Sequence, residues 1–253
     1  MFPIKSMHTM RRFFAIVLLG LCTFVVAVGV GKSGYLGVLK TYVYAILYRP
    51  LTDQHILAPY HKDKVDLFTA LERQQCDAVL IGDSLIDNGH WGELLTDYQV
   101  INRGVQGIVI SDLINMLDQI DLISSPIVVV MIGINDIRRN IPRDELFQNY
   151  AFLVDRLTDR YEFVLVHSVL LTKIEGRGLN QRIQDFNFEL KRLAERSERI
   201  VYVDLNTIFS PDGFLADRYS FDGIHLNGQG YLKWRDVISK HIGNMQARSH
   251  ARD

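Results

Sequence analysis

Short apolar runs alternate with helix-like segments from about residue 65 onward, and this alternation constrains the fold more than any other feature of the chain. Most of the runs are apolar at every position, which is typical of strands covered on both faces. Strands separated by helices form a parallel sheet. The sequence therefore predicts an α/β fold, a three-layer α/β/α sandwich around a five-stranded parallel sheet. The five runs occupy residues 78–81, 99–101, 127–132, 163–166 and 200–203.

Helix-like segments separate most of these runs and follow the last one. Each carries apolar residues three or four positions apart, which is the spacing of one helix face. We expect these faces to pack against the sheet and not to form a ligand site. The segments span residues 110–120, 146–157, 183–193 and 231–242.

The N-terminal part of the chain has a different character. Residues 13–31 contain no charged residue, and Lys5, Arg11 and Arg12 precede them. About 19 residues rising ~1.5 Å each extend about 28 Å, enough to cross the hydrocarbon core of a membrane. Basic residues before a span stay in the cytoplasm. We therefore expect a basic segment at residues 1–12, then a single-pass transmembrane signal anchor, with the following domain on the extracytoplasmic (periplasmic) side.

Two alternatives apply to this membrane topology. Ala27-Val28-Gly29 resembles a small-x-small cleavage site, so a cleaved signal peptide is the rival of the anchor. Residues 35–48 are apolar but interrupted by Lys40, and we expect an interfacial or packing helix; if they cross, the domain faces the cytoplasm. The other predicted boundaries are an apolar/linker region at 32–64, polar from 49 onward, an α/β domain at 65–246 and a flexible tail at 247–253.

Charge and cysteine content exclude several classes of protein. The chain has 28 lysines and arginines against 29 aspartates and glutamates and no basic stripe, so we expect no nucleic-acid partner. Cys22 and Cys76 are too few for a disulfide framework, and we expect both to be unpaired. Histidines, cysteines and carboxylates do not show metal-ligand spacing, so we expect no metal. The sequence gives no indication of an oligomeric state.

Four short motifs lie at or after the ends of predicted strands. A serine follows the first strand, a glycine the second and an asparagine the third, while a histidine lies in the connection after the fifth. Ligands bind beyond the carboxyl ends of the strands in open parallel sheets, so we expect all four motifs to meet at one edge. The motifs are Gly82-Asp83-Ser84, Asn102-Arg103-Gly104, Gly133-Ile134-Asn135-Asp136 and Asp222-Gly223-Ile224-His225.

These residue types suit acyl transfer through a serine. The hydroxyl of Ser84 needs a base within hydrogen-bond reach, and His225 can supply it. Asp222 can bind the other ring nitrogen and stabilise the imidazolium. The backbone N–H groups of Ser84 and Gly104 and the side-chain amide of Asn135 are the predicted oxyanion-hole donors.

In order and spacing, these motifs resemble the SGNH hydrolase superfamily, also called GDSL lipases or esterases, over roughly residues 76–240. Its four naming residue types match Ser84, Gly104, Asn135 and His225. The resemblance implies a flavodoxin-like sandwich and hydrolysis of esters or thioesters without a cofactor. It also implies that Ser84 is the nucleophile and His225 the base, and is strongest for acetylhydrolases and lysophospholipase-like enzymes.

The surroundings of the motifs refine this expectation. Many relatives continue the second motif as Gly-Gly-Asp-Thr, whereas residues 105–109 of this chain have the more apolar sequence Val-Gln-Gly-Ile-Val. We expect Asp83 to cap its turn and Asp136 to brace its loop. Only the short connection from Thr172 to Leu179 could act as a flap, which favours short acyl groups such as acetyl.

The sequence therefore predicts a serine esterase, anchored to the membrane by its N-terminal helix, that acts on a small-molecule, lipid or saccharide ester. Two alternatives use the same observations differently. An O-acyltransferase would pass the acyl group to an envelope saccharide and not to water. A non-enzymatic envelope binding protein would be consistent with the anchor but leaves the four motifs unexplained.

Overall fold

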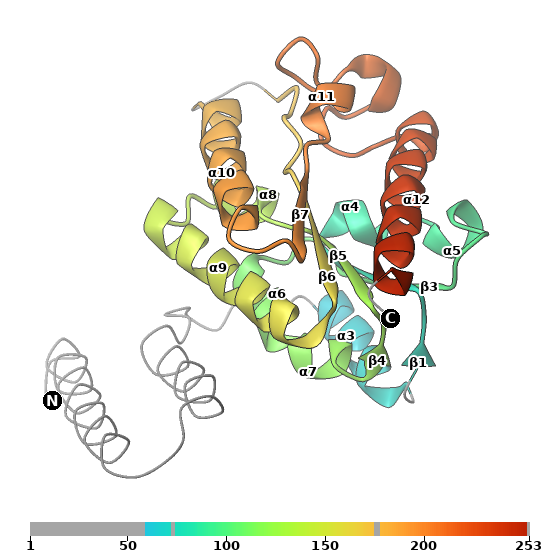
Figure 1. Cartoon of the computed structure of the whole chain (residues 1–253). Helices are drawn as coiled ribbons and strands as arrows, with labels where there is room; N and C mark the ends of the chain where they lie inside the picture. The colour runs from blue at the N-terminus through green and yellow to red at the C-terminus, as the bar shows by residue number, and fades with distance from the viewer. Residues whose placement is uncertain (1–58, 72–73, 175–177, 252–253) are drawn as a thin grey trace, which may run out of the picture. The chain divides into compact units, whose positions relative to one another are not determined.

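A five-stranded parallel sheet forms the centre of the computed structural model, which describes residues 59–71, 74–174 and 178–251 (Figure 1). The strand order is β3-β2-β5-β6-β7, and every neighbouring pair is parallel. The predicted sheet is confirmed. The strands are β2 (Ala78–Gly82), β3 (Val100–Gly104), β5 (Ile127–Met131), β6 (Phe163–His167) and β7 (Ile200–Val203).

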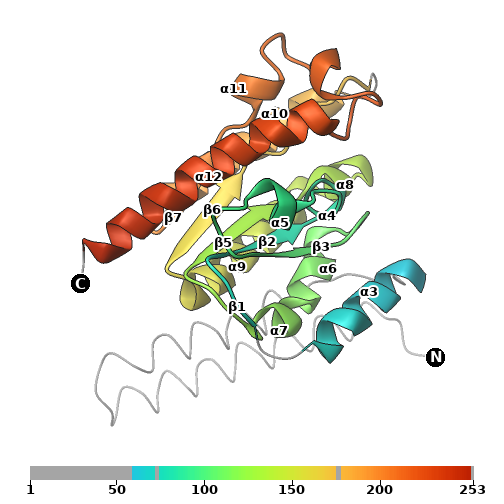
Figure 2. The same ribbon diagram turned by 90° about the vertical axis from the view of Figure 1, so that its right-hand side faces the viewer.

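Helices cover both faces of this sheet because alternate side chains of each buried strand point to opposite sides. Val79 and Ile81 of β2 belong to one apolar cluster, together with side chains of α6 (Ile110–Asn115), α7 (Leu117–Ile120), α9 (Arg143–Arg160) and α10 (Leu179–Ala194). Leu80 belongs to a second cluster, together with side chains of α4 (Ser84–Asp87), α5 (Trp91–Leu94), α11 (Asn206–Phe209) and α12 (Gly228–His250). Figure 2 shows α12 on one side of the sheet and α3 (Pro59–Ala70), α6 and α7 on the other, which makes three layers.

The helices follow the predicted stripes and add several short turns. They are α3 (Pro59–Ala70), α4 (Ser84–Asp87), α5 (Trp91–Leu94), α6 (Ile110–Asn115), α7 (Leu117–Ile120), α8 (Ile134–Arg138), α9 (Arg143–Arg160), α10 (Leu179–Ala194), α11 (Asn206–Phe209), the 3₁₀ turn η1 (Asp217–Tyr219) and α12 (Gly228–His250). Two short strands, β1 (Gln74–Gln75) and β4 (Ile123–Ser124), form a separate parallel pair.

The register of the central strands aligns their carboxyl ends. Gly82, the last residue of β2, pairs with Gly104 on one side and with Met131 on the other. Each of these three residues ends its strand. The loops that follow β2, β3 and β5 therefore leave the sheet at one level, which brings the first three motifs to one edge.

Four boundaries differ from the sequence prediction. The stripe at 110–120 is divided at Met116 into α6 and α7. Strand β3 extends through the polar residues to Gly104, beyond the predicted end at 101. Helix α3 begins at Pro59, within the segment predicted as a linker. Helix α12 continues to His250, into the predicted flexible tail.

The predicted basic segment at 1–12, the anchor at 13–31 and the apolar residues 35–48 lie outside the described residues. Within the ranges that are described, no helix combines the length and the apolar character needed to span a membrane. Cys76 is buried and unpaired, as predicted, while Cys22 lies outside these ranges.

Candidate active site

The turn after β2 places Ser84 at the first position of helix α4. Gly82 has φ +151°, and a Cβ there would lie 1.9 Å from the carbonyl oxygen of Met131, so only glycine fits the end of this strand. The side chain of Asp83 accepts a hydrogen bond of 3.1 Å from the Leu85 N–H and caps the helix, as predicted. Ser84 is half-buried and directly follows this cap.

Ser84, His225 and Asp222 form one hydrogen-bonded chain. Ser84 Oγ lies 3.0 Å from His225 Nε2, although the two residues are 141 positions apart. His225 Nδ1 lies 2.7 Å from Asp222 Oδ2. The carboxylate favours the tautomer with the proton on Nδ1, which leaves Nε2 free to accept the serine proton. The structure thus brings together the three residues that the sequence singles out.

Backbone groups hold the Asp222 carboxylate in place. Its Oδ1 accepts hydrogen bonds from the N–H of His225 at 2.7 Å and from the N–H of Ile224 at 2.9 Å. Burial raises the pKa of Asp222, but hydrogen bonds from the His225 ring and from these N–H groups outweigh it and hold the pKa below its usual range. Asp222 therefore stays negatively charged and can stabilise a positive charge on the His225 ring.

Asn135 reaches the same edge of the sheet from the first turn of α8. Gly133 precedes this helix with φ +132°, a conformation that favours glycine. Asn135 Nδ2 donates one hydrogen bond of 3.0 Å to the Ile108 carbonyl. An amide carries two N–H donors, so one remains for a further acceptor. Asp136 accepts hydrogen bonds from the Ile110 N–H at 3.1 and 3.3 Å, which confirms that it braces this loop.

Gly104 lies beside the site, but its N–H is already occupied. It donates a hydrogen bond of 2.8 Å to Asn102 Oδ1. A Cβ on Gly104 would lie 2.4 Å from the backbone nitrogen of Asp87, so the glycine is required by the close approach of α4. Gly107, three residues further, has φ +70°, and none of the hydrogen bonds within the described ranges uses its N–H.

The sequence of the domain matches a known family model. The model is that of the GDSL-like lipase/acylhydrolase family, and it matches residues 80–233, which include Ser84, Asn135, Asp222 and His225. The chain belongs to this family. It is accordingly a hydrolase that acts on ester bonds, and the resemblance to the SGNH hydrolase superfamily is confirmed.

Solved structures with the same fold come from several bacteria. A GDSL-like lipase from Bacteroides thetaiotaomicron is 22% identical, with a TM-score of 0.61 over 73% of this chain and 98% of that chain. A Streptococcus pneumonia protein whose name refers to platelet activating factor is 21% identical, with a TM-score of 0.62 over 80% and 99%. An acetylxylan esterase from Geobacillus stearothermophilus is 18% identical, with a TM-score of 0.56 over 66% and 94%. These likenesses establish the fold; no curated protein matches the chain.

Two buried carboxyl groups lie behind the site of this GDSL-like hydrolase. Burial raises the pKa of Asp83 to about 7, against the lowering effects of the Leu85 N–H and His225. Burial also raises the pKa of Asp136 to about 7, and the negative charge of Asp83 contributes to the rise. Each group therefore keeps its proton in the folded state at pH values where the unfolded chain has released it.

This linkage predicts that stability falls as pH rises. The pKa of an aspartate in the unfolded chain is ~3.9, so the folded state binds more protons than the unfolded state between about pH 4 and 7. For each proton retained in this way, the free energy of unfolding falls by about 1.4 kcal/mol per pH unit. Asp83→Asn keeps a helix cap but removes one titration. We expect denaturant unfolding at pH 5 and pH 8 to show a shallower loss of stability in the variant. Equal losses in the two proteins would contradict the raised pKa of Asp83.

A metal site is not evident near these groups. Among the residues whose positions are described, no three histidine, cysteine, aspartate or glutamate side chains gather closely enough to hold a metal ion. Asn102, which the sequence marks only as part of a motif, donates hydrogen bonds to the carbonyls of Ile86, Asp87 and Gly89 at 3.0, 3.3 and 3.1 Å. Its position directly after the predicted strand at 99–101, beside the glycine of the same motif, was the only signal in the sequence.

Proposed function

We propose that this protein is a serine esterase in which Ser84 carries the acyl group, His225 moves the protons and Asp222 orients the imidazole. The observation that carries the proposal is the 3.0 Å distance between Ser84 Oγ and His225 Nε2. A hydroxyl at this distance from a neutral imidazole nitrogen can lose its proton as it attacks a carbonyl carbon. The 2.7 Å contact between His225 Nδ1 and Asp222 stabilises the charge that then develops on the ring.

The reaction has two halves. In the first, His225 takes the proton of Ser84, the serine oxygen bonds to the carbonyl carbon of the ester, and the tetrahedral intermediate expels the alcohol with a proton from His225. In the second, His225 removes a proton from water, which attacks the acyl carbon. The bond to Ser84 then breaks, its oxygen takes the proton back, and a carboxylic acid leaves.

The oxyanion of each intermediate requires donors that already point toward it. The Ser84 N–H, at the positive end of α4, and the second amide hydrogen of Asn135 suit this role. Gly104, the third donor predicted from the sequence, could bind the oxyanion only if its N–H gave up its hydrogen bond to Asn102. The unoccupied N–H of Gly107 therefore suits this role better. Loss of one such donor typically costs about 3–4 kcal/mol of transition-state stabilisation.

The substrate that we propose carries a short acyl group, such as an acetyl ester of a small molecule or a saccharide. The acetylxylan esterase from Geobacillus stearothermophilus, which shares the fold, is named for such a substrate. Only a few residues separate Thr172 from the start of α10 at Leu179, so this part of the chain is too short to form a large lid. The location outside the cytoplasm stays a prediction from residues 13–31.

A series of p-nitrophenyl esters tests this substrate class. We expect turnover of the acetyl ester with a clearly higher kcat/KM than that of a long-chain ester, because a short acyl group does not require a long apolar groove. Product analysis with and without an added saccharide acceptor separates the hydrolase from an O-acyltransferase. Free acetate as the main product in both cases supports the hydrolase, whereas acyl transfer to the saccharide supports the transferase. Absence of any turnover would favour an envelope binding protein.

A further inference from the structure

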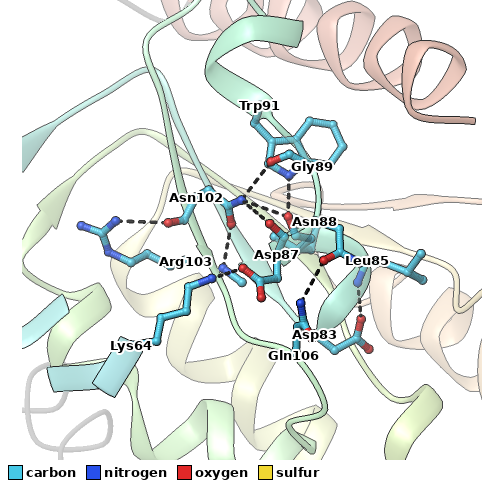
Figure 3. Close-up of polar contacts among 12 residues, drawn as sticks. Lys64, Asp83, Leu85, Asp87, Asn88, Gly89, Trp91, Asn102, Arg103 and Gln106 are labelled. Carbon is cyan, nitrogen blue, oxygen red and sulfur yellow. Dashed lines mark hydrogen bonds and ion pairs between the residues drawn. The ribbon is translucent and has the colours of Figure 1, made fainter. Parts of the chain in front are cut away.

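Helix α4, which carries Ser84, is only four residues long and depends on other elements for its position. The last carbonyl groups of a helix have no partner within the helix. Here Trp91 Nε1 donates to the Ile86 carbonyl at 2.8 Å, and the Tyr231 hydroxyl donates to the Leu85 carbonyl at 2.9 Å. The side-chain amide of Asn102 donates to the same Ile86 carbonyl and to the Asp87 carbonyl (Figure 3). The backbone of α4 is thus held from α5, α12 and β3.

A fourth contact holds a side chain of the helix and not its backbone. We propose that Lys64 of α3 is a positioning residue for Ser84, acting through its ion pair with Asp87 at the last position of α4. Figure 3 shows the Lys64 side chain reaching the Asp87 carboxylate, with Asn102 beside the same turn. This inference rests on the proposed nucleophilic role of Ser84 and adds a residue to it.

The Asp87 carboxylate is buried and therefore requires a positively charged partner. Its side chain is only 7% exposed, and its Oδ1 is bound by Lys64 Nζ. Its Oδ2 is buried, and no group in the described part of the chain bonds to it. A buried charge is tolerated only when it is paired, so Asp87 depends on Lys64 for its compensation. Without Lys64, the carboxylate must either take up a proton or turn outward to water.

Helix α3 holds Lys64 firmly at this position. Phe68, one turn further along α3, is 5% exposed and belongs to the apolar core. The guanidinium of Arg103 lies over the Phe68 ring, with its central carbon 4.6 Å from the ring centroid. Burial, together with the nearby charge of Arg103, lowers the pKa of Lys64, so the cation is disfavoured at this position except for its ion pair with Asp87.

A short path connects Asp87 to the nucleophile. The Asp87 N–H donates a hydrogen bond of 2.9 Å to the carbonyl of Asp83, the residue that caps α4 directly before Ser84. Rotation of the Asp87 carboxylate toward solvent would therefore strain the single turn on which Ser84 Oγ is held 3.0 Å from His225. Lys64 lies outside residues 80–233, so this support comes from a helix that the family model does not include.

The test compares four variants with the wild type. Lys64→Met removes the cation, Lys64→Arg restores it, and the double variant Lys64→Met/Asp87→Asn removes both charges. Lys62→Met, at an exposed position of the same helix, is the matched control. The readouts are kcat and KM for p-nitrophenyl acetate, the rate constant for labelling by a fluorophosphonate, which reports the nucleophile without the substrate, and Tm.

We expect Lys64→Met to lower kcat and the labelling rate together by about tenfold or more, with little change in KM, since a shift of ~1 Å in a reacting group can cost on the order of 10²-fold. Lys64→Arg and the double variant should recover most of this loss, and Lys62→Met should match the wild type. The inference is overturned if Lys64→Met labels at the wild-type rate, or if Lys64→Met and the double variant are equally slow. Failure of the wild type itself to react with the probe would instead refute the proposed function.

Discussion

Replacement of Ser84 with alanine should lower kcat for p-nitrophenyl acetate by on the order of 10⁵-fold, with Tm close to that of the wild type. The alanine removes the oxygen that receives the acyl group, so neither half of the reaction can follow the route through an acyl-enzyme. The fold should be retained because the Ser84 side chain is half-buried and its hydrogen-bond partner is the half-buried ring of His225. Steady-state kinetics and thermal unfolding of the purified protein measure both quantities.

Ser210→Ala is the matched control for this variant. Ser210 is 6% exposed, and its Oγ has no hydrogen-bond partner in the described part of the chain. Loss of that hydroxyl should leave kcat and Tm essentially unchanged. A Ser84→Ala protein that is folded and retains most of its activity would assign the nucleophile to another residue.

The second large effect is expected from Asp222→Asn, which should lower kcat by on the order of 10⁴-fold. The side-chain oxygen of the new amide can still accept the N–H groups of Ile224 and His225, so the loop is retained. Its NH₂ group, however, would face His225 Nδ1 as a donor. The ring would then carry its proton on Nε2, and Ser84 would lose the acceptor for its own proton.

The pH profile distinguishes this effect from a loss of structure. Because a neutral amide cannot stabilise the imidazolium, partial activity of the Asp222→Asn variant should persist only at alkaline pH, where hydroxide or a deprotonated alcohol replaces the general base. Asp217→Asn, which changes an exposed carboxylate that pairs with Lys173, should retain the wild-type profile. Equal activities of Asp222→Asn and Asp217→Asn would remove Asp222 from the mechanism.

Strands buried on both faces could be predicted almost to the residue. The runs at 127–132 and 163–166 correspond to β5 (Ile127–Met131) and β6 (Phe163–His167) because burial alone selects apolar residues there. Strand β3 is at the edge of the sheet and ends in polar residues that serve neighbouring elements. Its Asn102 holds the end of α4 and its Arg103 stacks on Phe68, so its apolar signal stops early.

Helix α3 could not be recognised in the same way. Between Pro59 and Ala70 only a few side chains, such as Phe68, join the core, while others serve polar contacts. The ion pair between Lys64 and Asp87 connects segments 23 positions apart, and no local pattern marks it. Topology, in contrast, was sufficient for the site, because parallel strands must end at one edge and the motifs followed those ends.

Gly104 shows the limit of assigning a role from a motif. The sequence predicts it as an oxyanion-hole donor, and the structure shows that only glycine fits at this position. The close neighbour is the backbone of Asp87, however, and the N–H of Gly104 is bonded to Asn102. Which N–H groups remain unoccupied depends on tertiary contacts, so the sequence could not single out Gly107 as a candidate donor.

The most direct test of the central claim is to map the site of covalent modification by a fluorophosphonate. After reaction, digestion and mass spectrometry, the adduct should lie on Ser84 with a stoichiometry close to one, and it should be absent when the protein is denatured before the probe is added. An adduct on a different residue, or a folded protein that does not react, would contradict the assignment of Ser84 and His225 as nucleophile and base.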